Sequence, residues 1–317
     1  MNSSSTNAIV FHCNKLSVGD IVNIDRTLYH SMQEWVDLVK VLLAFTVMAV
    51  ASRQDWRERM ADDIHWAVMG VAGLAFMALY VAMEGLRWEY HLIVIATAVL
   101  FLDIFWDNDG MGRALTMSPY AFALILLGAA IGVIGLEGMR YELLTPFILY
   151  WMFVLLYVFD VIKGGADAKC LISLALLFPL YPGLWSLPLL GLPTELAQLL
   201  LPFPLMVLFL ASVLSITILP YFLMRNIIRR DIRFPQSLLG KRIPIDVAEK
   251  GHYWPMERVR EDGTVEVKST PQGEDFNALR QAGAGMVWVT PKIPLLIPMT
   301  VALVILIIIG NPLFMLL

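Results

Sequence analysis

Two aspartates at the ends of apolar segments are the strongest candidates for chemistry in this sequence. Asp55 lies in the charged stretch 52–59, directly after one apolar segment, and Asp167 follows Gly164 and Gly165 and opens another. Ionisable residues at the depth of a membrane are energetically costly and are therefore functional candidates. Two carboxyl groups brought close together cannot easily both ionise, so one keeps a proton while the other accepts one. Such a pair can activate a water molecule to attack a peptide carbonyl and then protonate the leaving amine.

Each of these residues also has a purely structural interpretation. Asp167 could only cap the helix that it opens, since the positive helix end favours a carboxylate. Gly164 and Gly165 could form an ordinary turn, although glycine also lets a substrate backbone approach closely. Asp55 taken alone is more typical of a solvated loop acid paired with a nearby arginine. A pair of acids on one face of the membrane is therefore the hypothesis that the rest of the chain must support.

Other acids and other chemistries compete less well. The rival acids are Asp103, Asp107, Asp109 and Asp160. Of these, Asp107 and Asp109 belong to a turn-like stretch, and Asp103 and Asp160 are better suited to hydrogen bonds between helices than to chemistry. The five histidines are scattered without the spacing of metal ligands, and no Ser-His-Asp or Cys-His set is recognisable. Two cysteines cannot build a disulfide framework.

The composition predicts a polytopic membrane protein. The 317 residues are 58% hydrophobic and only 16% charged, with a mean hydropathy of +0.70, whereas apolar content near one half is typical of soluble domains. The net charge of −4 is small, and no basic patch interleaved with aromatic residues suggests nucleic-acid binding. The first 33 residues are polar and mixed, so we expect no cleavable signal peptide.

The hydrophobic segments predict about eight transmembrane helices, because a helix needs about 20 apolar residues to cross the hydrocarbon core. We expect spans at about 35–51, 64–83, 90–106, 119–136, 143–162, 167–180, 202–224 and 293–309. Residues 1–34 are expected to form an extracytoplasmic tail and 35–224 the membrane catalytic domain. Residues 225–291 have soluble composition and predict a small cytosolic α+β domain, with an Asp-Gly hairpin at 262–263 and a short helix within 272–282. Residues 292–317 would hold the final helix.

Eight spans place both aspartates on one side of the membrane. The short loops on that side carry most of the basic residues: Arg53, Arg57, Arg59, Arg113, Lys163 and Lys169. Loops on the opposite side carry only Arg87 and Arg140. Because positive charge favours the cytoplasmic side, we expect Asp55, Asp167 and the small domain to face the cytoplasm.

At this point the residues resemble a known family. The sequence Gly-Gly-Ala-Asp-Ala-Lys at 164–169 resembles the second motif of the GxGD-type aspartic proteases, with the archaeal preflagellin and type IV prepilin peptidases of the A24 family as the closest branch. The sequence Asp-Trp-Arg-Glu-Arg at 55–59 resembles their first motif, an aspartate followed by basic residues. The soluble stretch before the last span resembles the cytosolic module of archaeal members.

The resemblance implies a membrane aspartic endopeptidase. Asp55 and Asp167 would form its catalytic dyad, while Gly164, Gly165 and Lys169 would belong to the loop that meets the substrate. The implied partners are prepilin- or archaellin-like precursors and the lipid bilayer. The implied location is the cell membrane with the active site facing the cytoplasm, and no cofactor or metal is implied, because water is the nucleophile.

The sequence departs from the family pattern in two respects. Ala166 precedes Asp167, where the family usually has glycine, and this change is tolerated in archaeal members. Four expected spans separate the two motifs, whereas the family usually has about two. The additional pair preserves the sidedness of both aspartates.

Three other functions stay open at this stage. A protease similar to signal peptide peptidase would need Tyr-Asp and Pro-Ala-Leu strings, and neither occurs; Phe159-Asp160 is the nearest imitation. A transporter would depend on Asp103 and Asp160 rather than on the proposed pair. A non-catalytic assembly protein for pili would use the small domain as a docking surface and would tolerate loss of both carboxylates.

Overall fold

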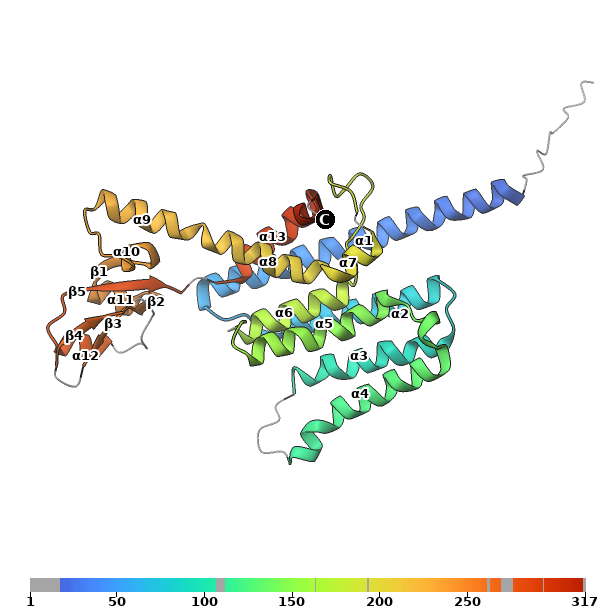
Figure 1. Cartoon of the computed structure of the whole chain (residues 1–317), viewed down its shortest axis with the longest axis horizontal. Helices are drawn as coiled ribbons and strands as arrows, with labels where there is room; N and C mark the ends of the chain where they lie inside the picture. Colours follow the sequence, from blue (N-terminus) through green and yellow to red (C-terminus); the bar gives the residue numbers. More distant parts are fainter. Residues whose placement is uncertain are drawn as a thin grey trace, which may run out of the picture.

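The structure is a computed structural model that describes residues 18–106, 112–162, 164–192, 194–260, 263–268, 276–292 and 294–315, without the side chains of 18–30 and 195. It consists of a helical bundle with a small mixed domain at one end (Figure 1). The predicted turn at 107–110 and Lys163 lie outside the described residues. The chain is therefore mostly helical, as the composition predicts, and it contains a small sheet region.

Five helical stretches are long and apolar enough to cross a membrane. They are α1 (Val18–Glu58) over Ser31–Glu58, α2 (Asp63–Met83), α4 (Arg113–Ile134), α5 (Tyr141–Val158), and α8 (Phe203–Ile216) together with α9 (Ile218–Ile228). Each coincides with one of the apolar segments recognised in the sequence. Membrane spans are thus supported at these five positions.

The prediction of eight spans is not confirmed. The three remaining apolar segments do form helices, namely α3 (His91–Asp103), α6 (Gly165–Leu177) and α13 (Leu296–Ile308), but each has only 13 residues. A helix of that length is about 20 Å long, whereas the hydrocarbon core is about 30 Å thick. The apolar runs in these segments include turns and extended residues beyond the helix ends, and hydropathy alone does not reveal where a helix stops.

The first helix is much longer than its apolar part. The sequence predicted a tail through residue 34 and a charged loop at 52–59, whereas α1 is continuous from Val18 to Glu58 over 41 residues. Its charged end is made of residue types with high helix propensity, chiefly Ala, Arg, Gln and Glu, so the helix continues after the hydrophobic run has ended. Asp55 consequently lies in the last turn of a helix and not in a loop.

The bundle is arranged in layers (Figure 1). Helices α2, α5 and α6 form a middle layer, with α1, α8 and α13 on one side and the α3–α4 pair on the other. Two glycines on α2 permit the closest contacts. A Cβ atom on Gly73 would lie 2.6 Å from the backbone carbon of Leu176 on α6, and a Cβ atom on Gly70 would overlap the Phe101 ring of α3. These positions therefore fix how closely α6 and α3 approach α2.

Short elements connect and complete the bundle. They are η1 (Trp88–Tyr90), η2 (Leu136–Gly138), α7 (Glu195–Leu200) and η3 (Pro312–Met315). The described residues of the proline-rich stretch between α6 and α7 are not helical, because proline lacks the backbone N–H that a helix interior needs. It includes one isolated bridge between Leu184 and Leu187.

The small domain has mixed helix and strand structure with its own hydrophobic core. Its elements are α10 (Gln236–Leu239), β1 (Lys241–Pro244), α11 (Ile245–Lys250), β2 (Tyr253–Pro255), β3 (Glu257–Val259), β4 (Val265–Val267), α12 (Phe276–Gln281) and β5 (Met286–Pro291). The order β1-β5-β2 forms an antiparallel sheet with β5 at its centre. Val287 and Val289 of β5 pack with Phe276 and Leu279 of α12.

Two local predictions for this domain are confirmed. Strands β3 and β4 pair antiparallel, with Arg258 opposite Glu266, and Gly263 between them has a φ of +79°. A positive φ suits glycine, which has no Cβ atom to clash. The two strands therefore pair on either side of the predicted turn, of which residues 261 and 262 lie outside the described residues. The short helix expected within 272–282 is α12.

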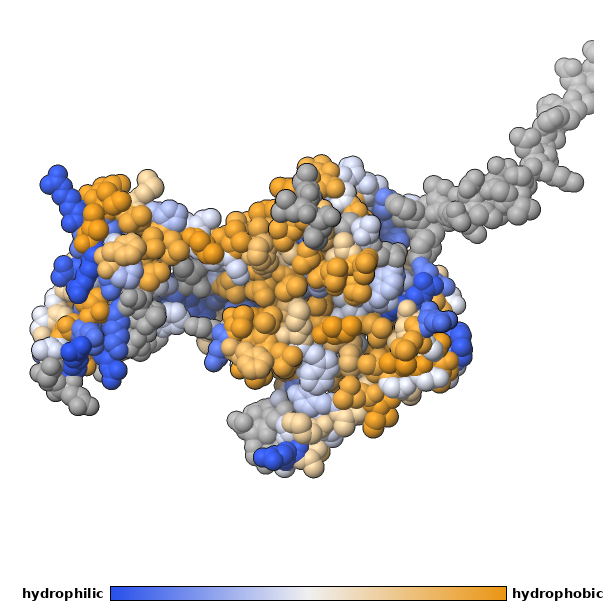
Figure 2. All heavy atoms as spheres, viewed as in Figure 1, coloured by the Kyte–Doolittle hydropathy of each residue, from blue (hydrophilic) through white to orange (hydrophobic). Residues whose placement is uncertain are grey.

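The bundle and the small domain differ in the hydropathy of their surfaces. Apolar side chains cover the visible face of the bundle, whereas hydrophilic side chains gather on the small domain (Figure 2). Many large apolar side chains of the candidate spans are exposed, among them Leu42, Phe122, Ile125 and Phe209. Soluble proteins rarely expose so much apolar surface, because its contact with water is unfavourable. The exposed side chains therefore indicate contact with lipid.

Candidate active site

The first candidate aspartate is held at the end of α1 by a tight connection to α2. The backbone N–H of Arg59 donates to the Asp55 carbonyl oxygen over 2.9 Å and closes the last turn. One residue earlier, the Gln54 side chain donates to the Asp62 carboxylate over 2.8 Å and accepts from the Asp62 N–H over 3.2 Å. Asp62 is the N-cap residue of α2, although its side chain makes no capping hydrogen bond.

The second candidate aspartate lies in the first turn of α6. Gly164 is the N-cap residue, with a φ of −94° and a ψ of 122°, and it makes no side-chain cap because it has no side chain. The Asp167 carboxyl group folds back over Gly164, so that a Cβ atom at Gly164 would lie 3.0 Å from the carboxyl carbon of Asp167. The positive end of the helix favours a carboxylate at this position. Gly164 is therefore required by the space that the Asp167 carboxyl group occupies.

The structure brings Asp55 and Asp167 together although they are far apart in the sequence. Helix α1 contacts α6, and the two carboxyl groups are near enough that the charge of Asp55 acts on Asp167. Both side chains are partly buried. The end of α1 that carries Asp55 faces the small domain (Figure 1). An electrostatic interaction between the two carboxyl groups is a precondition for a pair of acids that shares a proton.

Helix α6 is fixed against α2 by polar contacts as well as by packing. The Ser173 hydroxyl group lies 3.0 Å from the Trp66 carbonyl oxygen of α2 and 2.8 Å from the Lys169 carbonyl oxygen of its own helix. On the other side, α1 is tied to α13 by a 2.8 Å hydrogen bond between Ser52 and Thr300. Both aspartates are thus carried by helices whose positions are set within the bundle.

Lys169 is held by α2 rather than left free in the loop. Its ammonium group lies 2.7 Å from both carboxylate oxygens of Asp63 and 5.1 Å from the centre of the Phe105 ring. The Lys169 side chain is 23% exposed. The sequence interpretation did not foresee this ion pair, because Asp63 lies 106 residues before Lys169.

The rival acids have other surroundings. Asp103 accepts a hydrogen bond from the Tyr120 hydroxyl group of α4, which in turn is hydrogen-bonded to Tyr150 of α5. This agrees with the expectation that Asp103 joins helices. Asp160 is exposed and lies beyond the end of α5 with a φ of +55°. Asp107 and Asp109 lie outside the described residues.

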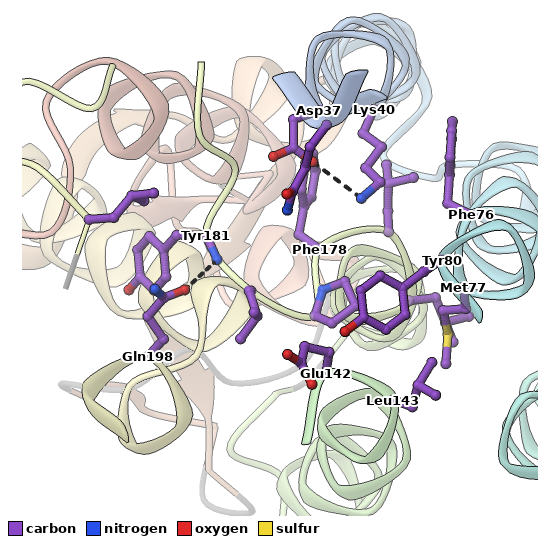
Figure 3. Close-up of a pocket in the computed structure, with 16 residues that line it drawn as sticks. Asp37, Lys40, Phe76, Met77, Tyr80, Glu142, Leu143, Phe178, Tyr181 and Gln198 are labelled. Carbon is purple, nitrogen blue, oxygen red and sulfur yellow. Dashed lines mark hydrogen bonds and ion pairs between the residues drawn. The ribbon is translucent and has the colours of Figure 1, made fainter. Parts of the chain in front are cut away.

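A cavity of about 230 Å³ lies beside the middle of α1 (Figure 3). Its walls come from α1, α2, α5, α6, α7 and the stretch after α6, and neither candidate aspartate lines it. Lys40 forms a 3.2 Å ion pair with Asp37 at its edge, and Asp37 also accepts a hydrogen bond from the Gly183 N–H over 3.1 Å. Asp55 follows Lys40 by 15 residues on the same helix, which corresponds to a rise of about 22 Å along the helix axis. The cavity is therefore separate from the aspartate pair.

One residue beside Asp55 was missed by the sequence interpretation. Arg59 has its Nε and Nη1 atoms buried, and they have no hydrogen-bond partner among the described residues. The sequence suggested only that an arginine could pair with a loop acid. The spacing of four residues from Asp55 was the available signal, because residues i and i+4 are neighbours on a helix.

No metal centre is formed by the described residues, in that no three or more His, Cys, Asp or Glu side chains among them are grouped to hold an ion.

Comparison with known proteins connects this arrangement to a family. Residues 233–311 match the family described as "Archaeal Peptidase A24 C-terminus Type II". The resemblance to archaeal A24 peptidases is confirmed. A preflagellin peptidase of Methanococcus maripaludis is 24% identical over 286 residues, which cover 86% of this chain and 96% of that protein.

The two matches cover different parts of the chain. The A24 domain match includes the small domain from Arg233 and continues through α13, so the strands and the last apolar helix belong to one recognised unit. The preflagellin peptidase match extends over most of the bundle as well. The chain is thus a membrane protein with a peptidase-family domain.

Proposed function

We propose that this protein is a membrane aspartic endopeptidase that removes the leader peptide from prepilin- or preflagellin-like precursors. The observation that supports the proposal most is that α1 and α6, which carry Asp55 and Asp167, are in contact, and that the charge of Asp55 acts on Asp167. The similarity to a preflagellin peptidase over most of the chain supports the substrate class.

The proposed chemistry needs one shared proton and one water molecule. The ionised carboxylate takes a proton from water as the water oxygen attacks the scissile carbonyl carbon. The protonated carboxyl group donates its proton to the carbonyl oxygen, giving a neutral tetrahedral intermediate. Collapse of this intermediate transfers a proton to the leaving amine and restores the starting state of the pair. We assign the two roles to Asp55 and Asp167 jointly, because coupled carboxyl groups titrate as a pair.

The proposal places both aspartates at the cytoplasmic face of the membrane. Arg53 and Arg57 beside Asp55, and the arginines at the start of the small domain, support this orientation, because basic residues favour the cytoplasmic side. We retain eight membrane segments, with α3, α6 and α13 surrounded by longer helices. A short helix is tolerated at membrane depth when its backbone ends are buried in protein rather than in lipid.

A transporter is the strongest alternative from another class of function. It would depend on Asp103, which lies within an apolar helix. The hydrogen bond from Tyr120 to Asp103 gives this acid a role in joining α3 to α4. The peptidase proposal therefore expects Asp103→Asn to lower stability and to leave the cleavage site unchanged.

Cleavage of a precursor tests the proposal directly. Membranes containing the protein would be incubated with a precursor whose leader ends in a basic residue and glycine, and the products would be identified by mass. Wild type should cleave, whereas Asp55→Asn and Asp167→Asn should each reduce cleavage to background, because neither carboxyl group can replace the pair. Asp160→Asn is the matched control and should cleave normally. Cleavage that persists in both single variants would refute the assignment.

A further inference from the structure

Arg59 has an unusual backbone conformation for its residue type. It directly follows the last residue of α1 and has a φ of +58°, a region that residues other than glycine rarely adopt. Such strain persists only where the surrounding structure enforces it, and it is concentrated at functional sites. The observation justifies asking what this side chain does.

Two nitrogen atoms of the Arg59 guanidinium group have no acceptor among the described residues. The Nε and Nη1 atoms are buried and lack a partner among the described residues, while the group lies 5.3 Å from the centre of the Trp56 ring. A buried charged donor without an acceptor is costly, and most such donors in proteins are paired. An acceptor that arrives with a bound peptide would recover this cost.

The group is close to Asp55 but not paired with it. The charge of Arg59 acts on the Asp55 carboxyl group, yet within the described part of the chain the two side chains form no ion pair. Asp55 therefore remains free to act as a base, and the donors of Arg59 remain free for a third group. Both groups are available at one place, the connection between α1 and α2.

We propose that Arg59 is a substrate-binding residue that donates hydrogen bonds to main-chain carbonyl oxygens of the precursor beside the scissile bond. This inference rests on the proposed function. A neutral carbonyl oxygen is the acceptor that fits, because an acidic side chain of the substrate would be repelled by Asp55 and Asp167. Two nitrogen atoms on one planar group suit an extended peptide, which presents more than one carbonyl oxygen.

The neighbouring arginine supplies a matched control. Arg57 lies in the last turn of α1 and is exposed. It carries the same charge as Arg59 and lies only two residues before it in the chain. Any general attraction between a positive charge and the membrane surface or the leader would be lost equally from either position. Only the buried donors distinguish Arg59.

Steady-state cleavage and precursor binding would test the inference. Arg59→Gln should reduce kcat/KM by about 10-fold or more, the loss expected for a hydrogen bond to a charged group, whereas Arg57→Gln should change it by less than about 2-fold. Arg59→Lys should recover only part of the activity, because a single ammonium group replaces two separate donors. In the Asp167→Asn background, Arg59→Gln should also weaken binding of the uncleaved precursor, which a purely structural role would not do.

A variant that reduces the backbone strain at position 59 serves as the control for folding. Asn tolerates a positive φ better than Arg, so Arg59→Asn should keep or raise Tm and still lose activity. The inference would be overturned if Arg59→Gln cleaved and bound like wild type, or if the Arg57 and Arg59 variants lost activity equally. Failure of wild type to cleave at all would instead refute the proposed function.

Discussion

Replacing Gly164 by alanine tests whether the position of the Asp167 carboxyl group controls cleavage. The backbone of Gly164 has a φ of −94° and a ψ of 122°, which alanine adopts without strain. The new Cβ atom would lie 3.0 Å from the Asp167 carboxyl carbon, and nearer still to one of its oxygens. The carboxyl group is at the end of a rotatable side chain, so it moves and the helix stays in place.

The size of the effect follows from this geometry. An ordinary contact needs at least 3.4 Å, so the nearer carboxyl oxygen must move by about 1 Å, or the carboxyl group must rotate to another position. A misplacement of about 1 Å at a reacting group costs about 100-fold in rate. Stability should hardly change and can rise by about 0.4–1 kcal/mol, because alanine restricts the unfolded chain more than glycine does. We therefore expect Gly164→Ala to lose about 10- to 100-fold in kcat with an unchanged or higher Tm.

Gly165→Ala is the matched control in the same assay. The nearest atom to a Cβ atom at Gly165 is the Tyr157 hydroxyl oxygen at 3.8 Å, an ordinary contact. Precursor cleavage would be measured at saturating substrate for both variants, with Tm recorded for the same preparations. If Gly164→Ala kept wild-type kcat, or if Gly165→Ala lost as much, the carboxyl group of Asp167 would not be the group that matters.

Two further predictions concern packing and pH. Gly73→Ala should lower stability by about 2–4 kcal/mol and also reduce cleavage, because the added Cβ atom meets the Leu176 backbone of α6. Gly128→Ala is the control, because a Cβ atom there meets open space. It should be neutral or stabilising in the same thermal unfolding measurement. Burial raises the pKa of Glu257, whose carboxylate accepts from the Trp288 N–H, so the small domain should lose stability as the pH rises from below the ordinary glutamate value through the raised one. Hydrogen-exchange protection of β5 in the full chain, corrected for intrinsic exchange rates, would show this pH dependence. Glu257→Gln should abolish the dependence. A wild-type stability profile that is flat or rises with pH would contradict the assignment.

The candidate pair was predictable because each aspartate is marked locally. Asp55 follows an apolar run and Asp167 opens one, and the sidedness of the intervening segments then places them on one face. Hydropathy needs only the positions of the apolar runs for this step. It does not need the helix ends to be correct, so the prediction that Asp55 and Asp167 lie on one face does not depend on where each helix stops.

The remaining details depend on contacts between distant segments. Nothing in the composition of α6 shows that Lys169 pairs with Asp63 of α2. The helical conformation of 52–58 was missed because charge was taken as a sign of a loop, whereas these residue types favour helices. The positive φ and the burial of Arg59 were equally invisible, since both arise from the packing of the turn after α1.

The central place of β5 in its sheet has a mechanical consequence. The chain passes from β5 through a short link into α13, and α13 is hydrogen-bonded to α1 between Thr300 and Ser52, less than one helical turn before Asp55. A force applied to the small domain would therefore pass along a strand held on both edges into a helix fastened beside Asp55. A binding partner that pulled or twisted this domain would therefore act on the end of α1 without touching Asp55 itself.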